Sequence, residues 1–155
     1  MKTINLLICV SAGLFLFGCA EDHTGNASTQ SLEADASLDG TEWVLTGYND
    51  TPLPDELRNR SELKFSLDAD GRAFKVSGRS FINSYFGNAT IDQEANMMSI
   101  PVVGATKMGG SQEDMKAEML YFQRLEQVTS YKIDRNNRLI LYFGHQGESA
   151  YFTEK

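Results

Sequence analysis

Few residues in this 155-residue chain are of the types that carry out nucleophilic, acid–base or metal chemistry. There are two cysteines, Cys9 and Cys19, and two histidines, His23 and His145. His23 follows an acidic pair in a polar stretch and His145 lies in a glycine-bounded turn, so we expect both to be solvated. The sequence has no serine-hydrolase elbow, phosphate-binding loop or metal-ligand spacing. It therefore predicts no catalytic residue, no metal and no cofactor.

Cys19 has the clearest chemical role, because it ends an apolar segment. Lys2 precedes a mostly apolar run over residues 4–17, which is the pattern of a secretory signal. This run is shorter than the roughly 20 apolar residues of an ordinary transmembrane helix. Leu16, Gly18 and Cys19 resemble the bacterial lipobox, in which the cysteine is diacylated and the bond before it is then cleaved.

The lipobox predicts a protein of the bacterial cell envelope. A signal peptide over residues 1–18 would be removed, and the acyl chains (palmitate among them) on Cys19 would hold the chain in a membrane. We expect the outer membrane, on the periplasmic face or, if Glu21 and Asp22 act as an export signal, on the cell surface. With Cys9 removed and Cys19 acylated, the domain has no thiol for catalysis, metal binding or a disulfide.

The charge of the chain also limits its partners. There are 21 acidic and 14 basic residues, which give a formal net charge of −7. An acidic surface argues against nucleic-acid binding and against adhesion to anionic lipid head groups. Carboxylates are plentiful, but the sequence alone does not pair any two as acid and base. A hydrolase with an unrecognised carboxylate site therefore stays open as the alternative to a binding module.

A flexible tether over residues 19–39 is predicted to join the anchor to one domain over residues 40–155. The tether is polar, so it cannot bury enough apolar surface to offset the entropy cost of ordering. The domain shows short alternating segments bounded by turn residues. Strands are predicted at 41–48, 61–67, 73–78, 84–92, 97–102, 130–134, 138–143 and 150–153.

Regular strand spacing predicts an α+β fold that is mainly β, with a small antiparallel barrel-like sheet of about eight strands. Residues 68–71 are interpreted as a hairpin turn rather than a calcium loop, since Gly71 comes two positions too early and Arg72 replaces a ligand.

One helix is predicted to begin after Ser111, which resembles a capping residue. Its apolar stripe consists of Met115, Met119, Phe122 and Leu125. We expect this stripe to pack on the sheet, although a methionine-bearing stripe is also typical of an adaptable binding groove. The helix should plug an open end of the barrel or cover one face.

Several short motifs resemble the META, or HslJ-like, domain family of bacterial lipoproteins. They lie at residues 40–45 (GTEWVL), 76–87, 106–108 and 139–142, in the family's order. The resemblance implies a small barrel-like α+β fold, an envelope location and links with stress tolerance, antibiotic resistance and secretion, without an established reaction. The family-motif positions in this chain are Trp43, Gly78, Asn83, Thr106 and Met108.

This chain departs from the family at two positions. Many members carry one cysteine in the family's signature loop, which lies within residues 76–87 here, and another just after the T-x-M element at residues 106–108. These two cysteines look like a disulfide pair. Here the two positions are occupied by Ile82 and Gly110. The resemblance therefore implies that packing of Ile82 and hydrogen bonds from Asn83 hold the loop.

The function expected from the anchor, the tether and the lack of catalytic groups is that of a non-catalytic binding or assembly module linked to envelope stress tolerance. Its partner would be another envelope protein or an apolar ligand, met through the mouth of the barrel. The state of the barrel interior discriminates between modes of binding. A filled interior would favour contact through the outer surface.

Overall fold

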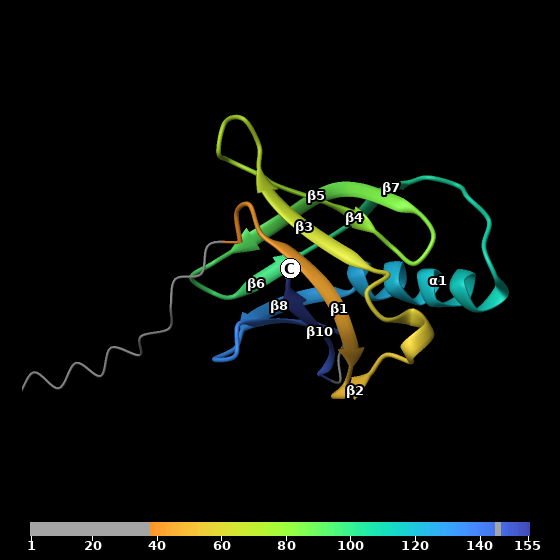
Figure 1. Ribbon diagram of the computed structural model, residues 1–155. Coiled ribbons are helices and arrows are strands. Elements are labelled where there is room, and N and C mark those ends of the chain that lie inside the picture. The colour runs from red at the N-terminus through yellow and green to blue at the C-terminus, as the bar shows by residue number, and fades with distance from the viewer. Residues whose placement is uncertain (1–37, 145–146) are drawn as a thin grey trace, which may run out of the picture. The chain divides into compact units, whose positions relative to one another are not determined.

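The computed structural model describes residues 38–144 and 147–155. These residues form ten strands, one short 3-10 helix and one α-helix. Eight strands close an antiparallel barrel in the order β1–β3–β4–β5–β6–β8–β9–β10, and β10 pairs back with β1 (Figure 1). The predicted α+β, mainly β barrel is confirmed. The lipobox with Cys19, and both His23 and His145, lie outside the described residues.

The elements follow one another along the chain with short connections. Two strands, β2 and β7, lie off the closed path and pair with β1 and β5 respectively. In chain order the elements are β1 (Glu42–Tyr48), β2 (Thr51–Pro52), the 3-10 helix η1 (Asp55–Leu57), β3 (Glu62–Leu67), β4 (Phe74–Arg79), β5 (Ser84–Asp92), β6 (Met97–Ser99), β7 (Val102–Ala105), α1 (Gln112–Glu126), β8 (Val128–Ile133), β9 (Arg138–Phe143) and β10 (Glu148–Glu154).

Alternating side chains explain why these segments form strands with one buried face. In β1, Trp43 and Leu45 are buried, and in β3 Leu63 and Phe65 are buried, while their neighbours face outward or are half-buried. The turn between β3 and β4 is a hairpin, as predicted. The Asp68 carboxylate accepts hydrogen bonds from the backbone N–H groups of Arg72, at 2.8 Å, and of Ala73, at 3.3 Å.

The interior of the barrel is filled by side chains. The largest fully buried ones are Trp43, Tyr121, Phe65, Phe143 and Phe152, with seven aliphatic side chains around them. A void beneath α1, lined in part by Phe143 and Phe152, has a volume of about 10 Å³, which is room for about one water molecule. The interior therefore favours contact through the outer surface.

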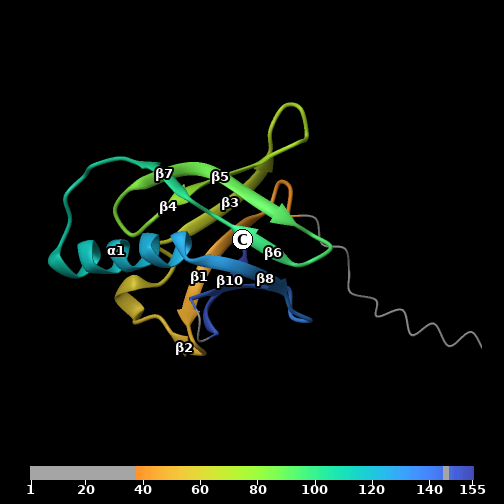
Figure 2. The same cartoon turned by 180° about the vertical axis from the view of Figure 1, so that it is seen from behind.

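The helix α1 lies at the end of the barrel opposite the β3–β4 turn (Figures 1 and 2). The Ser111 hydroxyl caps it by accepting a hydrogen bond from the Asp114 backbone N–H at 3.1 Å. Tyr121 and Leu125 insert into the core. Among the described residues, no helix is long and apolar enough to cross a membrane.

The predicted apolar stripe of α1 is confirmed at Phe122 and Leu125, which pack on the core, and is wrong at Met115 and Met119. Met115 and Met119 are 48% and 61% exposed, whereas Tyr121 is fully buried and Glu118 faces the loop before β5. An aromatic ring buries more apolar surface than a methionine, and the Tyr121 hydroxyl finds a partner in the Tyr85 hydroxyl at 2.7 Å. The helix therefore turns Tyr121 inward.

Several boundaries also differ from the prediction, by up to two residues at β8 and β10 and more clearly at three other places. The strand expected at 97–102 is interrupted, because Pro101 has no N–H to donate and the chain leaves β6 to form β7 against β5. Residues 104–105, which lie outside every strand predicted from the sequence, belong to β7. Leu38, expected in the tether, is 0% exposed, and Gly40 donates its N–H to the Phe65 carbonyl.

Candidate binding groove

The loop between β4 and β5, residues 80–83, is held by one buried asparagine. Asn83 Nδ2 donates to Glu118 Oε1 at 2.6 Å and to the Met108 carbonyl at 3.3 Å. Its Oδ1 accepts from Thr106 Oγ1 at 2.8 Å and from the Met108 N–H at 2.7 Å. The structure thus brings three family-motif positions together. Met108 contributes its backbone alone, since its side chain is exposed.

Glu118 of α1 completes this network from the other side. Its Oε2 accepts hydrogen bonds from Ser80 Oγ at 2.5 Å, from the Asn83 N–H at 2.8 Å and from the Ile82 N–H at 3.3 Å. Burial alone would raise the pKa of Glu118, but these hydrogen bonds outweigh it and hold the pKa below its ordinary value. Sequence reasoning missed Glu118, because no motif marks it. Its spacing from Tyr121 and Leu125 on one helix face was the available signal.

Ile82 lies against Gly110, so the two positions at which the family resemblance implies a cysteine pair are neighbours here. A Cβ built on Gly110 would lie 2.6 Å from Ile82 Cδ1. Ile82 therefore occupies the space that a side chain at 110 would need. The expectation that Ile82 packing and Asn83 hydrogen bonds hold this loop is confirmed.

The other two family-motif positions, Trp43 and Gly78, belong to the barrel wall. The Trp43 indole is buried, and its Nε1 donates to Thr41 Oγ1 at 2.7 Å. A Cβ on Gly78 would lie 2.0 Å from the Glu62 carbonyl oxygen, so any side chain there would force β3 and β4 apart. These positions support the fold rather than a site.

A groove of about 450 Å³ lies on the outer side of α1, between the helix and the segment that contains η1. Its apolar lining comes from Leu53, Pro54, Leu57, Phe81, Ala117 and Leu120, and its polar lining from Tyr48, Glu56, Glu113, Lys116 and Arg124.

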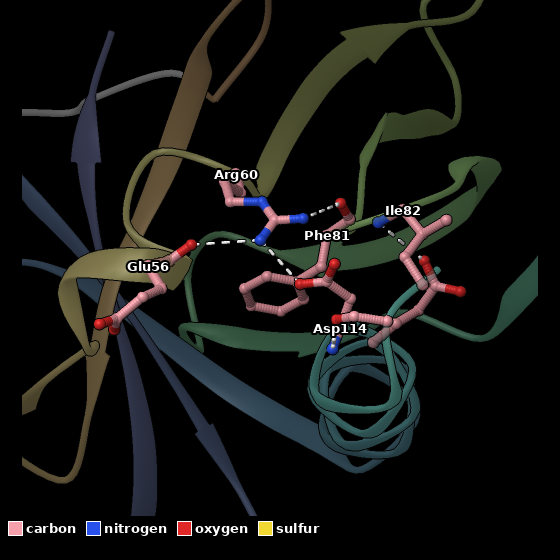
Figure 3. A network of polar contacts seen from close by, with 7 residues as sticks. Glu56, Arg60, Phe81, Ile82 and Asp114 are labelled. Atoms are coloured by element: carbon pink, nitrogen blue, oxygen red, sulfur yellow. Dashed lines mark hydrogen bonds and ion pairs between the residues drawn. The ribbon is translucent and has the colours of Figure 1, made fainter. Parts of the chain in front are cut away.

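Arg60 fixes one end of the groove by joining three elements (Figure 3). Its guanidinium donates to the Glu56 carbonyl at 3.2 Å, to Asp114 Oδ1 at 2.7 Å and to the Phe81 carbonyl at 3.3 Å. The hydrogen bond from Arg60 holds the pKa of Asp114 below its ordinary value, and Asp114 in turn raises the pKa of Arg60. The signature loop, η1 and the first turn of α1 are therefore tied at one point.

Arg124 lies at the other end of the groove and is arranged differently. Its guanidinium carbon lies 3.8 Å from the centroid of the Tyr48 ring and 5.8 Å from that of Phe143. The Tyr48 hydroxyl is shielded from solvent, and no described residue accepts the hydrogen of this hydroxyl, although the Arg124 side chain can donate to its oxygen. Burial raises the pKa of Tyr48, and the hydrogen bond from Arg124 and its positive charge offset only part of this rise, so the phenol keeps its proton. Sequence reasoning missed both residues, since neither belongs to a motif.

The family follows from a comparison with known protein families, in which residues 36–155 match the META domain. The chain belongs to the META domain family. The match covers the whole described barrel, including the signature loop and α1. A search of curated proteins finds no match to this META-domain chain.

Two solved structures share the fold of this META domain. A protein from Burkholderia xenovorans, solved by NMR, is 21% identical over 76% of this chain and 83% of its own, with a TM-score of 0.59. A DUF4847 family protein from Bacteroides vulgatus is 12% identical over 75% of this chain and 93% of its own, with a TM-score of 0.52. At these identities the similarity shows the fold alone.

Proposed function

We propose that this META-domain protein is a lipid-anchored protein of the bacterial cell envelope whose domain binds a partner without catalysing a reaction. The observation that carries the binding role is the contrast between a filled barrel and an open groove of about 450 Å³ beside α1. A concave, mostly apolar surface with a few charged groups is typical of ligand and partner sites. A role in envelope stress tolerance rests on the family resemblance.

The anchor is tested at Cys19. Two or three acyl chains bury enough methylenes, at about 0.8 kcal/mol each, to make attachment effectively permanent. We expect the C19S variant to accumulate as unprocessed or soluble protein when cell fractions are compared. Protein that still sediments with membranes after an alkaline wash would contradict the lipid anchor.

The groove is tested by site-specific crosslinking in intact cells. A photo-reactive amino acid in place of Leu120, on the groove wall, should form an adduct with an envelope component, either a protein or a lipid. The matched control is the same amino acid in place of Lys132, an exposed residue of β8 that does not line the groove. Equal adducts at both positions, or none at Leu120, would argue against binding in the groove.

The hydrolase alternative has weaker support from the arrangement of acidic side chains. Glu56 and Glu113 both line the groove, but both are exposed. A carboxyl group acts as a general acid near neutral pH when burial or a like charge raises its pKa. Where the surroundings shift a described carboxyl pKa, they lower it, as at Glu42, Asp68, Asp114, Glu118 and Asp134.

A further inference from the structure

Arg124 stands apart from the other half-buried arginines of the described domain. Arg60 pairs with Asp114 at 2.7 Å and Arg138 pairs with Asp134 at 2.7 Å. None of the ion pairs among the described residues includes Arg124, whose guanidinium lies on the Tyr48 ring instead. Taking a cation partly out of water without an anion is unfavourable, so this end of the groove is suited to an anionic group.

The Tyr48 hydroxyl adds a second unused donor at the same place. Tyr48 lines both the groove and the small void beneath α1, and no described residue accepts the hydrogen of its solvent-shielded hydroxyl. Buried polar groups are nearly always hydrogen-bonded, and exceptions call for an explanation. A carboxylate that contacts Arg124 and Tyr48 together would satisfy both, because a carboxylate oxygen accepts from each kind of donor.

The charges give the groove a direction. Glu113 and Glu56 line its other end, near the Arg60 contacts, and would repel an anion there. Between the ends the wall of α1 presents Ala117 and Leu120, with Lys116 beside them. An anionic head at Arg124 and an apolar tail toward the Arg60 end match this distribution.

The length of the groove indicates the size of the tail. Glu113 and Arg124 are eleven residues apart on α1, which at about 1.5 Å per residue is roughly 16 Å, the length of a dodecanoyl chain. The six apolar side chains of the lining offer no partners for the N–H and C=O groups of a peptide backbone, which must be hydrogen-bonded when buried. An alkyl chain has no such requirement.

We propose that the groove binds a fatty acid, with its carboxylate on Arg124 and Tyr48 and its alkyl chain along Ala117 and Leu120 toward Arg60. This inference rests on the proposed binding function and specifies its ligand. It also accounts for the unpaired cation, the unused hydroxyl and the apolar wall through one molecule.

The test compares decanoate with 1-decanol, which has the same chain length and no charge, by calorimetric titration. The protein is the full chain carrying C19S, so that its own acyl groups do not compete. We expect decanoate to bind at least about ten-fold more tightly than decanol. R124Q should remove this preference, and Y48F, which keeps the ring beneath Arg124, should weaken decanoate binding about three-fold. The control is R72Q, because Arg72 is an exposed arginine in the β3–β4 turn. This substitution should leave the affinities for decanoate and decanol unchanged.

Decanol also reports on the fold of each variant, because R124Q should bind it as the parent does if the groove is intact. The proposal would be overturned if the parent bound decanoate and decanol with equal affinity. It would also be overturned if R124Q kept the parent's preference for decanoate over decanol. Tighter binding of a peptide that ends in a free leucine carboxylate would overturn it in favour of a protein C-terminus. If crosslinking at Leu120 still captures an envelope component while decanoate does not bind, the fatty-acid inference fails and the binding function stands.

Discussion

Glu118 and Asn83 show how a charged and a polar side chain can be structural in this domain. Asn83 uses its whole amide, and the Glu118 carboxylate receives four donors from three residues of the same loop. A carboxylate in such a network serves as an acceptor that fixes the loop rather than as a catalytic acid. In this chain the residues around Asn83 therefore attach the loop to α1.

Replacement of Glu118 by glutamine should destabilise the domain. The amide that replaces one oxygen is a donor and would face either Asn83 Nδ2 or the backbone N–H groups of the loop, which are donors too. Leaving such groups unpaired costs about 1–3 kcal/mol. We expect the free energy of unfolding of E118Q to be lower than that of the parent by this amount. Urea unfolding followed by Trp43 fluorescence measures it, since Trp43 is the single tryptophan and is buried.

The control for this substitution is E126Q, on the exposed end of the same helix. It removes the same charge without touching the loop, so its unfolding free energy should stay within about 0.5 kcal/mol of the parent. Equal losses for E118Q and E126Q would show that charge, not the loop network, decides the effect.

The same carboxylate gives the domain an acid-sensitive contribution. The folded pKa of Glu118 lies below its ordinary value of 4.5, so the unfolded chain takes up a proton first as the pH falls. The stabilisation is therefore complete above about pH 5 and is lost as the pH falls from the unfolded pKa through the folded pKa.

The measurement is the free energy of unfolding between pH 6 and pH 3. E118Q should show a shallower decline than the parent, with the remaining slope due to groups such as Asp114, whose pKa Arg60 also lowers. Parallel declines for the two proteins would contradict a contribution from Glu118.

At the scale of elements, the contact between the signature loop and the segment before α1 is where the family resemblance implies a cysteine pair that this chain lacks. A Cβ on Gly110 would lie 2.9 Å from Ile82 Cγ1. In a disulfide, each sulfur lies roughly 3 Å from the Cβ of the other cysteine. A sulfur in place of Ile82 Cγ1 would lie at about this distance from a Cβ at position 110. The backbone of Gly110 is not in the left-handed region, so a cysteine fits there.

The double variant I82C/G110C should accordingly form a disulfide and stabilise the domain. A cross-link that closes a loop of this kind contributes about 2–4 kcal/mol, chiefly by restricting the unfolded chain. In a C19S background, the melting temperature should be higher without reductant than with it. The reduced double variant is the control, because it has lost Ile82 packing without gaining the cross-link. Failure to oxidise would show that the two positions are further apart than described.

The prediction of elements from sequence succeeded where the pattern is local. The strands around Trp43, Leu63 and Tyr85 were placed to within a residue or two, because alternation and turn residues determine them. The rotation of α1 was not predictable, since Met115 and Met119 are as apolar as the residues that are buried. Tyr121 is turned inward by contacts with Tyr85 and the core, which lie far away in the sequence.

For the whole molecule, the barrel was predictable as a class and the groove was not. Closure depends on pairing between β1 and β10 at opposite ends of the domain, with Trp43 opposite Glu154. The groove is assembled from the end of β1, the η1 segment, the signature loop and α1. No local motif records this juxtaposition, so Arg124 and Tyr48 carried no signal before the elements were placed together.

The limit of the folded unit gives the last prediction. Leu38 is fully buried, and its carbonyl accepts the hydroxyl hydrogen bond of Thr41 at 2.7 Å. Asp39 Oδ1 accepts the Leu67 N–H at 2.7 Å. These residues therefore belong to the folded domain, although composition alone assigned them to the tether.

A fragment that begins at residue 36, where the family match starts, should unfold with the same free energy as one that begins at residue 20. A fragment that begins at residue 40 loses the buried Leu38 side chain and should be less stable by about 2–5 kcal/mol, the usual loss when a buried leucine is removed. L38A in the longer fragment should show most of this loss, while L32A, the same substitution earlier in the predicted tether, should show little. If the fragment from residue 40 were as stable as the others, the barrel would not depend on Leu38, and the tether would extend as far as the sequence composition places it.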